Sequence, residues 1–402
     1  MAAGRGLGSL TLEEYEPQLW SCLSCYCGLC VEGCPCYRAT AREVLAARGL
    51  AQVALAVLRG ELPVEELPDE LVYACTGCRW CEWLCSMNTP RFIVEHGDRR
   101  TRVSGATMAE LLRALKVESG RVPKQVRDAL NGLVRHGNPY GRPRALKDRW
   151  VEELGLKLSG QETLLYVGST VPFEERAKGM AEALVELLRL AGLEFGMLGG
   201  SELDSGAFAR ALGEEGLFEE LVEHNKRLLA QARVRQVICL SPHDYDAFLN
   251  FYGLEGVEFK HYTQVLHELL EAGRLRPGRL AARVVYHDPC YLGRRHGIYD
   301  EPRAVLKAIP GLELVEPRGW TRERSFCCGG GGAGLFYEVP GLDLHLHRID
   351  QLAETGADYV AVACPICRQM LEDAAKSRDY GLEVRDVAEL LLQAVQGGRA
   401  AG

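Results

Sequence analysis

Two short cysteine runs decide the fold of this chain: residues 22–36 read CLSCYCGLCVEGCPC, and residues 75–85 read CTGCRWCEWLC. The second run has the spacing Cys75-x2-Cys78-x2-Cys81-x3-Cys85, with which a tight loop wraps a 4Fe–4S cubane. Its three closely spaced thiolates bind three iron atoms, and the fourth cysteine reaches across to a second cluster. A zinc knuckle also uses four thiolates, but two such runs in one chain favour iron–sulfur clusters.

The first run holds more cysteines than one cluster needs. It ends in the regular pattern Cys30-x3-Cys34, followed by a proline. Upstream of this ending, three cysteines compete for two ligand places: Cys22, Cys25 and Cys27.

Two arrangements of these three thiols are compatible with the spacing. In one, Tyr26 and Cys27 are a two-residue insertion, and their removal restores the regular pattern. In the other, Cys27 is regular, and Cys22 or Cys25 replaces the ligand expected at Ser24. The sequence leaves both open.

Crossed ligation between the two runs predicts two cubanes. One takes Cys30, Cys85 and two of the three upstream thiols. The other takes Cys34, Cys75, Cys78 and Cys81, while Cys36 is interpreted as a spare thiol. Helical patterns at 42–59 and 106–117 surround the runs, so we expect an α-helical two-cluster ferredoxin domain over residues 1–135.

Composition narrows the class of protein. The chain has 402 residues and a formal net charge of −8, which repels a phosphate backbone and argues against nucleic acid as a partner. No stretch approaches the roughly 18 apolar residues that span a bilayer, and the N-terminus lacks the apolar core of a signal peptide. We therefore expect a cytoplasmic protein that reaches the membrane only through a partner. Of its sixteen cysteines, ten fall between Cys22 and Cys85 and five between Cys290 and Cys367. In that reducing compartment, clustered thiols are expected to be metal ligands rather than disulfides.

From residue 163 the pattern changes to alternating strands and helices, which is typical of an α/β architecture with parallel strands. The expected strands cover 163–167, 234–240, 283–287 and 358–364, and the expected helices cover 177–190, 262–273, 303–309 and 387–395. A Gly/Pro/Arg-rich stretch, HGNPYGRPR from His136, predicts a linker over 136–162. The rest divides into two α/β (Rossmann-like) repeats, 163–275 and 276–402.

The two repeats align motif by motif, but their chemistry differs. The second repeat carries Cys290, the pair Cys327-Cys328-Gly329, and Cys364-x2-Cys367. The aligned positions of the first repeat hold only serine and aspartate: Ser169, Asp204, Ser205, Ser241 and Asp244. The first repeat is therefore expected to be a vacant copy, and Cys239 near its motif is a core thiol.

Five thiols, two of them adjacent in sequence, fit poorly around one tetrahedral zinc and favour a polynuclear centre. Polar and basic residues next to these cysteines could take part in the chemistry of the site. His287 and Asp288 could deliver protons or only form hydrogen bonds. Three basic residues could attract an anionic substrate or lie on the surface: Arg294, Arg295 and His296. The glycines of GGGGAG after Cys328 would let backbone N–H groups approach the cluster sulfurs.

The cysteine pattern of the second repeat, preceded by HDPCYLGR at 287–294, resembles the cysteine-rich CCG domain of the heterodisulfide reductase family. Two ferredoxin motifs ahead of two such domains resemble its iron–sulfur subunit. They are equally similar to the iron–sulfur subunits of glycolate oxidase and anaerobic glycerol-3-phosphate dehydrogenase. The resemblance implies that five thiols bind a noncubane 4Fe–4S centre and carry any catalysis there: Cys290, Cys327, Cys328, Cys364 and Cys367.

These expectations combine into an electron-transfer subunit of a redox complex. Electrons would pass from a flavoprotein dehydrogenase through two cubanes and the C-terminal centre to a quinone, a cytochrome or a disulfide. No flavin or NAD site is expected in this chain, because the only G-x-G-x-x-G match follows two cysteines rather than a strand. Two alternatives stay open: a heterodisulfide-reductase-type enzyme acting at the C-terminal centre, and a ferredoxin-type protein with a structural zinc there.

Overall fold

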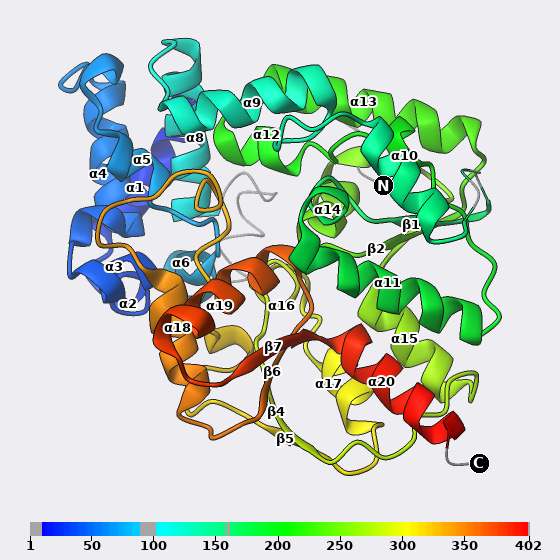
Figure 1. Cartoon of the computed structure of the whole chain (residues 1–402). Helices are drawn as coiled ribbons and strands as arrows, with labels where there is room; N and C mark the ends of the chain where they lie inside the picture. Colours follow the sequence, from blue (N-terminus) through cyan, green and yellow to red (C-terminus); the bar gives the residue numbers. More distant parts are fainter. Residues whose placement is uncertain (1–9, 89–101, 157, 159–160, 401–402) are drawn as a thin grey trace.

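The computed structural model describes residues 10–88, 102–156, 158 and 161–400. Figure 1 shows three parts: a helical domain in blue and cyan, an α/β unit in green, and a second α/β unit in yellow to red. None of the described helices combines the length and the apolar character that crossing a bilayer requires.

The N-terminal part is helical, as the sequence predicts. Its helices are α1 (Glu16–Ser24), α2 (Leu29–Glu32), α3 (Pro35–Thr40), α4 (Ala47–Leu58), α5 (Asp69–Tyr73), α6 (Trp80–Leu84), α8 (Gly105–Glu118) and α9 (Lys124–His136). The helix expected over 42–59 is interrupted, because Ala46 is extended at φ −92° and ψ 171° and caps α4. A separate 3-10 turn, Glu43–Leu45, precedes it.

The first α/β unit contains a three-stranded parallel sheet in the order β1-β2-β3. Its strands are β1 (Thr163–Tyr166), β2 (Gln236–Cys239) and β3 (Glu258–His261). Its helices are α11 (Glu175–Leu190), α12 (Ala207–Leu212), α13 (Glu215–Gln231), α14 (Pro242–Ala247) and α15 (Tyr262–Glu271). Strands β1 and β2 are buried and apolar after their first residue, as expected for a parallel sheet covered on both faces, whereas β3 is a partly exposed edge strand.

The second α/β unit contains a four-stranded parallel sheet in the order β5-β4-β6-β7. Its strands are β4 (Ala282–Tyr286), β5 (Leu312–Val315), β6 (Tyr359–Val362) and β7 (Glu383–Asp386). Its helices are α16 (Gly293–His296), α17 (Asp300–Lys307), α18 (Leu344–Ala353), α19 (Pro365–Arg378) and α20 (Val387–Ala400). The strand order repeats that of the first unit, where a single parallel bridge between Leu164 and Gly196 stands in place of β5.

The two units pack on each other reciprocally. Helix α11 of the first unit contacts α20 of the second, and α17 of the second contacts α15 of the first. The same kinds of helix therefore meet twice, which is the contact pattern of a two-fold arrangement. A buried hydrogen bond of 2.6 Å from the Tyr262 hydroxyl to Asp386 joins the units at the same boundary.

The stretch expected to be a linker is more ordered than its composition suggests. It contains helix α10 (Ala145–Glu153), which buries Trp150 and Val151 against the first unit. The Asn138 side chain closes the preceding turn by accepting from Arg142 N–H and donating to the carbonyls of His136 and Arg142. Residues 157, 159 and 160 of this stretch lie outside the described residues.

A single buried arginine ties the helical domain to the first α/β unit. Arg113 of α8 is 1 % exposed and donates to three backbone carbonyls, those of Val72, Cys75 and Ala211. Ala211 belongs to α12, whereas Cys75 begins the second cysteine run. The guanidinium therefore fixes a cysteine-bearing loop relative to a distant unit.

Arg113→Met should lower the free energy of unfolding by about 3 kcal/mol, because three buried carbonyls lose a charged donor. Anaerobic denaturant and thermal unfolding measure the change. Arg127→Met is the matched control, since exposed Arg127 bonds to Val122 of its own segment and its loss should change stability by less than about 0.5 kcal/mol. Equal effects of the two substitutions would contradict a bridging role.

Candidate iron–sulfur sites

Site A is a cavity beside α1, α2 and α6 that is lined by Ala47, Arg48 and six cysteines. One of the six, Cys81, belongs with the thiols of site B described below. The other five are Cys22, Cys25, Cys27, Cys30 and Cys85. Site A brings the fourth cysteine of the second run to the first run, as crossed ligation requires. Burial, followed by the charge of Cys85, raises the pKa of Cys30 to about 11. Four of these thiols are enough for one cubane, so the site holds one more than it needs.

The backbone around site A bears on the choice between the two arrangements of the first cysteine run. Gly28, directly after Cys27, is left-handed at φ 67° and caps α2. Arg79, directly after Cys78, is left-handed at φ 57° and caps α6 in the same way. The two loops are thus locally alike, with Cys27 in the place of Cys78 and Cys30 in the place of Cys81. This likeness favours the arrangement in which Cys22 or Cys25 replaces the ligand expected at Ser24.

Cys22 and Cys25 differ in their surroundings. Cys22 is buried on α1, where burial and then the neighbouring Cys30 thiolate raise its pKa to about 12. Cys25 is nearer the surface, with its sulfur 3.3 Å from that of Cys27 and 3.6 Å from the Ser86 hydroxyl. Cys22 therefore faces the buried side of the cavity, and Cys25 lies at its rim.

Site B gathers four thiols from both runs: Cys34, Cys75, Cys78 and Cys81. Burial, and then the charges of the other three thiols, raise the pKa of Cys81 well above its ordinary value. Gly105 N–H at the start of α8 donates to the Cys81 sulfur at 3.3 Å. Cys36 lies close by but donates to the Ala74 carbonyl at 3.3 Å.

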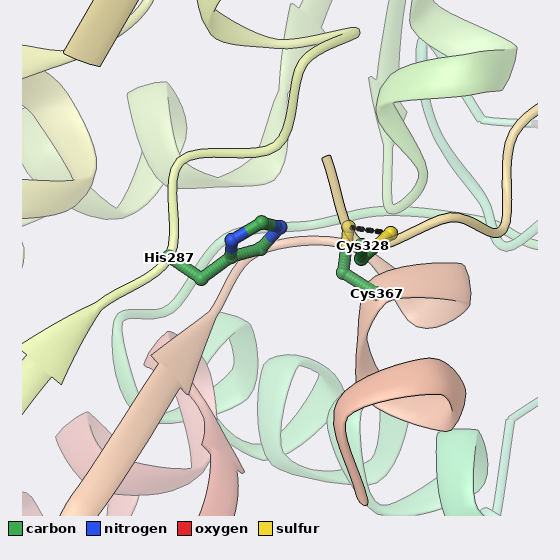
Figure 2. Close-up of side chains that lie close together, drawn as sticks. All are labelled: His287, Cys328 and Cys367. Atoms are coloured by element: carbon green, nitrogen blue, oxygen red, sulfur yellow. Dashed lines mark hydrogen bonds between the residues drawn. The ribbon is translucent and has the colours of Figure 1, made fainter. Parts of the chain in front are cut away.

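Site C contains the five cysteines of the second α/β unit at the carboxyl ends of its strands, where sites of open parallel sheets collect. All five are buried: Cys290, Cys327, Cys328, Cys364 and Cys367. Their sulfurs form two close pairs, Cys290 with Cys327 at 4.0 Å and Cys328 with Cys367 at 3.3 Å. Figure 2 shows the second pair, with His287 pointing toward it from the end of β4.

His287 lies beside site C as a neutral imidazole. Burial lowers its pKa, and Arg348 donates to its Nδ1 at 3.0 Å. The ring proton must then be on Nε2, which has no hydrogen-bond partner among the described residues. The ligand atoms of His287, Cys328 and Cys367 all lie within 4.8 Å of one another. Buried Arg348 is thus a site residue that sequence reasoning missed, since it is 61 positions away from His287.

Sites B and C are in direct contact. Cys327 of site C donates to the Thr76 hydroxyl at 3.4 Å, inside the loop that carries Cys75 and Cys78. The glycines after Cys328 make this approach possible. A Cβ added at Gly331 would lie 2.4 Å from the Thr76 carbonyl oxygen, and one at Gly332 would lie 2.4 Å from that of Cys75. Gly329 N–H also donates to the Cys327 sulfur at 3.4 Å, as expected for glycines beside a cluster.

The first α/β unit repeats the pairing of site C with oxygen atoms. Ser169 donates to Asp204 at 2.5 Å, where the second unit pairs Cys290 with Cys327. Ser205 donates to Asp244 at 2.6 Å, where the second unit pairs Cys328 with Cys367. The four side chains satisfy one another by hydrogen bonds, so this copy is closed on itself.

Asp288, beside site C, makes the kind of contacts expected in one of the two roles that the sequence left open, that of a hydrogen-bonding residue. It forms a buried ion pair with Arg303 at 2.6 Å and accepts from Arg322 N–H at 2.8 Å. These contacts favour a structural role over proton delivery.

The three basic residues after Cys290 neither reach an open site nor lie on the surface. Arg294 and Arg295 donate to the carbonyls of Cys78 and Gly77 at 2.8 Å each. His296 pairs with a carboxylate of the first α/β unit, that of Asp246, at 2.8 Å.

The donor sets fit iron–sulfur clusters. Thiolates are the ligands that such clusters select, and burial makes isolated thiolates unfavourable, so these groups need a cationic core to stay ionised. The directions of two pKa shifts agree with that cost. Burial raises the pKa of Cys75 to about 12, and the Cys327 hydrogen bond, followed by burial, raises the pKa of Cys78 well above its ordinary value.

Comparison with known proteins agrees with this chemistry. A 4Fe–4S dicluster domain matches residues 18–89, and a cysteine-rich domain matches residues 284–372. The probable iron-sulfur-binding oxidoreductase FadF of Bacillus subtilis is 36 % identical over 82 % of this chain and 47 % of its own length. One chain of a heterodisulfide reductase from Methanosarcina barkeri is 28 % identical over 92 % of both proteins. The chain is homologous to the heterodisulfide-reductase-like iron–sulfur proteins. The expected resemblance is therefore confirmed.

Several relatives are longer than this chain. The EtfAB:quinone oxidoreductase of Syntrophomonas wolfei is 32 % identical over 94 % of this chain but only 58 % of its own length. This chain thus spans about half the length of the first relatives it matches. The matches cover the iron–sulfur and α/β parts of this chain. The partners and acceptors that appear in the relatives' names are those of the relatives.

The Ser/Asp cluster of the first unit predicts that the stability of the folded chain depends on pH. Burial, and then the charge of Asp204, raise the pKa of Asp244 to about 8, while an unfolded aspartate titrates near about 4. The folded chain therefore holds an extra proton between these values, and the stability it gives is lost as the pH rises through 8. Asp244→Asn cannot ionise, so its stability relative to the unsubstituted chain should increase from pH 5 to pH 8.

Unfolding of both proteins across that pH range measures the difference. Asp300→Asn is the control. Its partner is Arg322, whose hydrogen bond outweighs the effect of burial and lowers the pKa of Asp300 below its ordinary value. The effect of that substitution should therefore stay constant from pH 5 to pH 8. A constant effect of Asp244→Asn would show that Asp244 is already ionised in the folded chain.

Proposed function

We propose that this chain is an iron–sulfur electron-transfer subunit with 4Fe–4S cubanes at sites A and B and a noncubane 4Fe–4S centre at site C. The observation that carries the proposal is the direct contact between the cysteine loop of site B and Cys327 of site C. Site A adjoins site B in turn, because Cys81 also lines the site A cavity. Clusters bound at sites A, B and C would supply one-electron transfer from each site to the next.

The chain's own residues have three tasks in this proposal. Cys22, Cys27, Cys30 and Cys85 hold the first cubane, and Cys25 is the surplus thiol. The ligands of the second cubane are Cys34, Cys75, Cys78 and Cys81, and those of the noncubane centre are the five cysteines of site C. Close packing excludes water from sites B and C, and N–H donors such as Gly105 and Gly329 stabilise the thiolates.

The domain division supports the same arrangement: a ferredoxin domain over 1–135, a connecting segment over 136–162, a first repeat without the cysteine ligands over 163–275 and a cysteine-rich second repeat over 276–402. We infer a flavoprotein dehydrogenase as donor and a quinone, cytochrome or disulfide as acceptor. The name of the S. wolfei relative gives EtfAB as one partner and quinone as the other. One relative is a probable membrane-anchored ferredoxin, which supports a location of this chain beside a membrane. We infer that another protein of the complex makes the contact with the membrane.

A structural zinc at site C is the second candidate. The closeness of His287 to Cys328 and Cys367 favours it, since zinc accepts imidazole and thiolate together. Five thiols favour the noncubane centre instead, because a tetrahedral zinc leaves at least one of them without a metal.

Metal analysis of anaerobically purified protein separates the two candidates. The proposal expects about twelve irons, four for each of three centres. Cys328→Ser should lower the content to about eight irons, because site C loses one ligand of its closest sulfur pair. Cys239→Ser is the control and should keep all the iron, since this buried thiol lies on β2 of the first repeat. About eight irons with one zinc in the unsubstituted chain would favour the structural site.

Three further serine substitutions test the ligands of site A. Cys22→Ser and Cys27→Ser should each cost about four irons and the spectrum of one cubane. Cys25→Ser should keep both, because the remaining four thiols complete the site. Loss of the cubane in Cys25→Ser with retention in Cys27→Ser would instead support a two-residue insertion at Tyr26 and Cys27.

A further inference from the structure

The first repeat keeps two side chains turned toward the sites of its neighbours. Both lie on α14, the helix that aligns with the start of α19 and its Cys367. His243 stacks on Tyr291, with ring centroids 3.7 Å apart. Asp246 pairs with Arg295 at 2.7 Å and with His296 at 2.8 Å. Tyr291 directly follows Cys290 of site C, so both contacts reach the segment that carries a candidate ligand.

Arg295 connects this repeat to site B. Its Nη1 donates to Asp246, while its Nη2 donates to the carbonyl of Gly77, between Cys75 and Cys78. The side chain is 4 % exposed, and its guanidinium lies 3.6 Å over the Tyr291 ring. One planar cation thus touches the first repeat, the loop of site B and the neighbour of Cys290. Lysine cannot make these contacts at once, because its ammonium is a single point.

Arg294 makes the parallel contact next to it. Its Nε donates to the Cys78 carbonyl at 2.8 Å, and its Nη1 donates to the Ser325 carbonyl at 2.6 Å, two residues before Cys327. A buried cation, Arg295, and a partly buried one, Arg294, therefore lie where sites B and C meet. Positive charge close to a cluster stabilises its reduced form, since reduction adds negative charge.

We propose that the first repeat is a positioning element for electron transfer. Through Asp246 it holds Arg295 at the joint between sites B and C, which is the place where the loop of site B meets the segment of Cys290. The same carboxylate sets the balance of charge at this joint. This inference rests on the proposed function, because it needs clusters at both sites. It gives the repeat a task in place of metal binding. The carboxylate offsets the adjacent cation, so the pair fixes geometry while limiting the rise in potential.

The chain offers a matched set of substitutions. Asp246→Asn removes a buried carboxylate and leaves Arg295 uncompensated, so the midpoint potentials of the centres at sites B and C should rise. Arg295→Gln removes the cation and leaves Asp246 uncompensated, so both potentials should fall. Glu202→Gln is the control and should leave both potentials unchanged. Glu202 forms a buried pair of 2.6 Å with Lys147, whose other bond is to the Gly168 carbonyl of the same repeat.

Redox titration of the anaerobic full-length protein, followed by electron paramagnetic resonance, measures these shifts. Arg295→Lys adds a second readout. It keeps the charge, so the potentials should stay near those of the unsubstituted chain, while the magnetic interaction between the reduced centres should weaken as the joint loosens. Loss of iron from site B or C in Asp246→Asn, with full iron in Glu202→Gln, would also support a positioning role.

Shifts in the same direction for Asp246→Asn and Arg295→Gln would overturn the inference, since opposite charges were removed. Titrations identical to the control would overturn it as well. Failure of the proposed function looks different: the unsubstituted protein would then lack iron or lack signals from the two centres. With those signals present and unmoved by either substitution, only the role of the first repeat is rejected.

Discussion

The charge of buried thiolates is the constraint on which the rest of this molecule depends. Sites B and C place most of their sulfurs away from water, and burial together with neighbouring thiols raises the pKa values of Cys75 and Cys81. Such a set is tolerable only around a cationic core. The surroundings follow from that need: N–H donors directed at sulfur, a neutral imidazole beside Cys328, and three arginines around the second α/β unit's cysteines.

Sequence spacing anticipated the grouping of the cysteines but not the choice among crowded ones. The pattern from Cys75 to Cys85 assigns each thiol a place, since a short loop leaves few alternatives. At Cys22, Cys25 and Cys27 the spacing is ambiguous, and the left-handed backbone at Gly28 and Arg79 was needed to align the loops. Backbone conformation at an arginine leaves no trace in residue type.

In the α/β units, too, features encoded by a short stretch of sequence could be predicted, whereas contacts between residues far apart in the chain could not. Strands around 163–167 and 358–364 were predictable because buried parallel strands are continuous apolar runs. Helix α10 was hidden by the glycines and prolines that precede it. The partners of Arg113, Arg294 and Arg295 come from chain positions far apart. No local pattern encodes such contacts, so the sequence left Arg294 and Arg295 open between a substrate-binding role and a place on the surface.

The glycine loop after Cys328 has a consequence for how the centres are built. Its backbone fits directly against Thr76 and Cys75, with no room for side chains at Gly331 and Gly332. The wall of the C-terminal centre is therefore supplied by a segment made far earlier in synthesis. An isolated fragment of the second α/β unit would lack that wall, so the cluster proposed for site C would form after the amino-terminal loops have taken their shape.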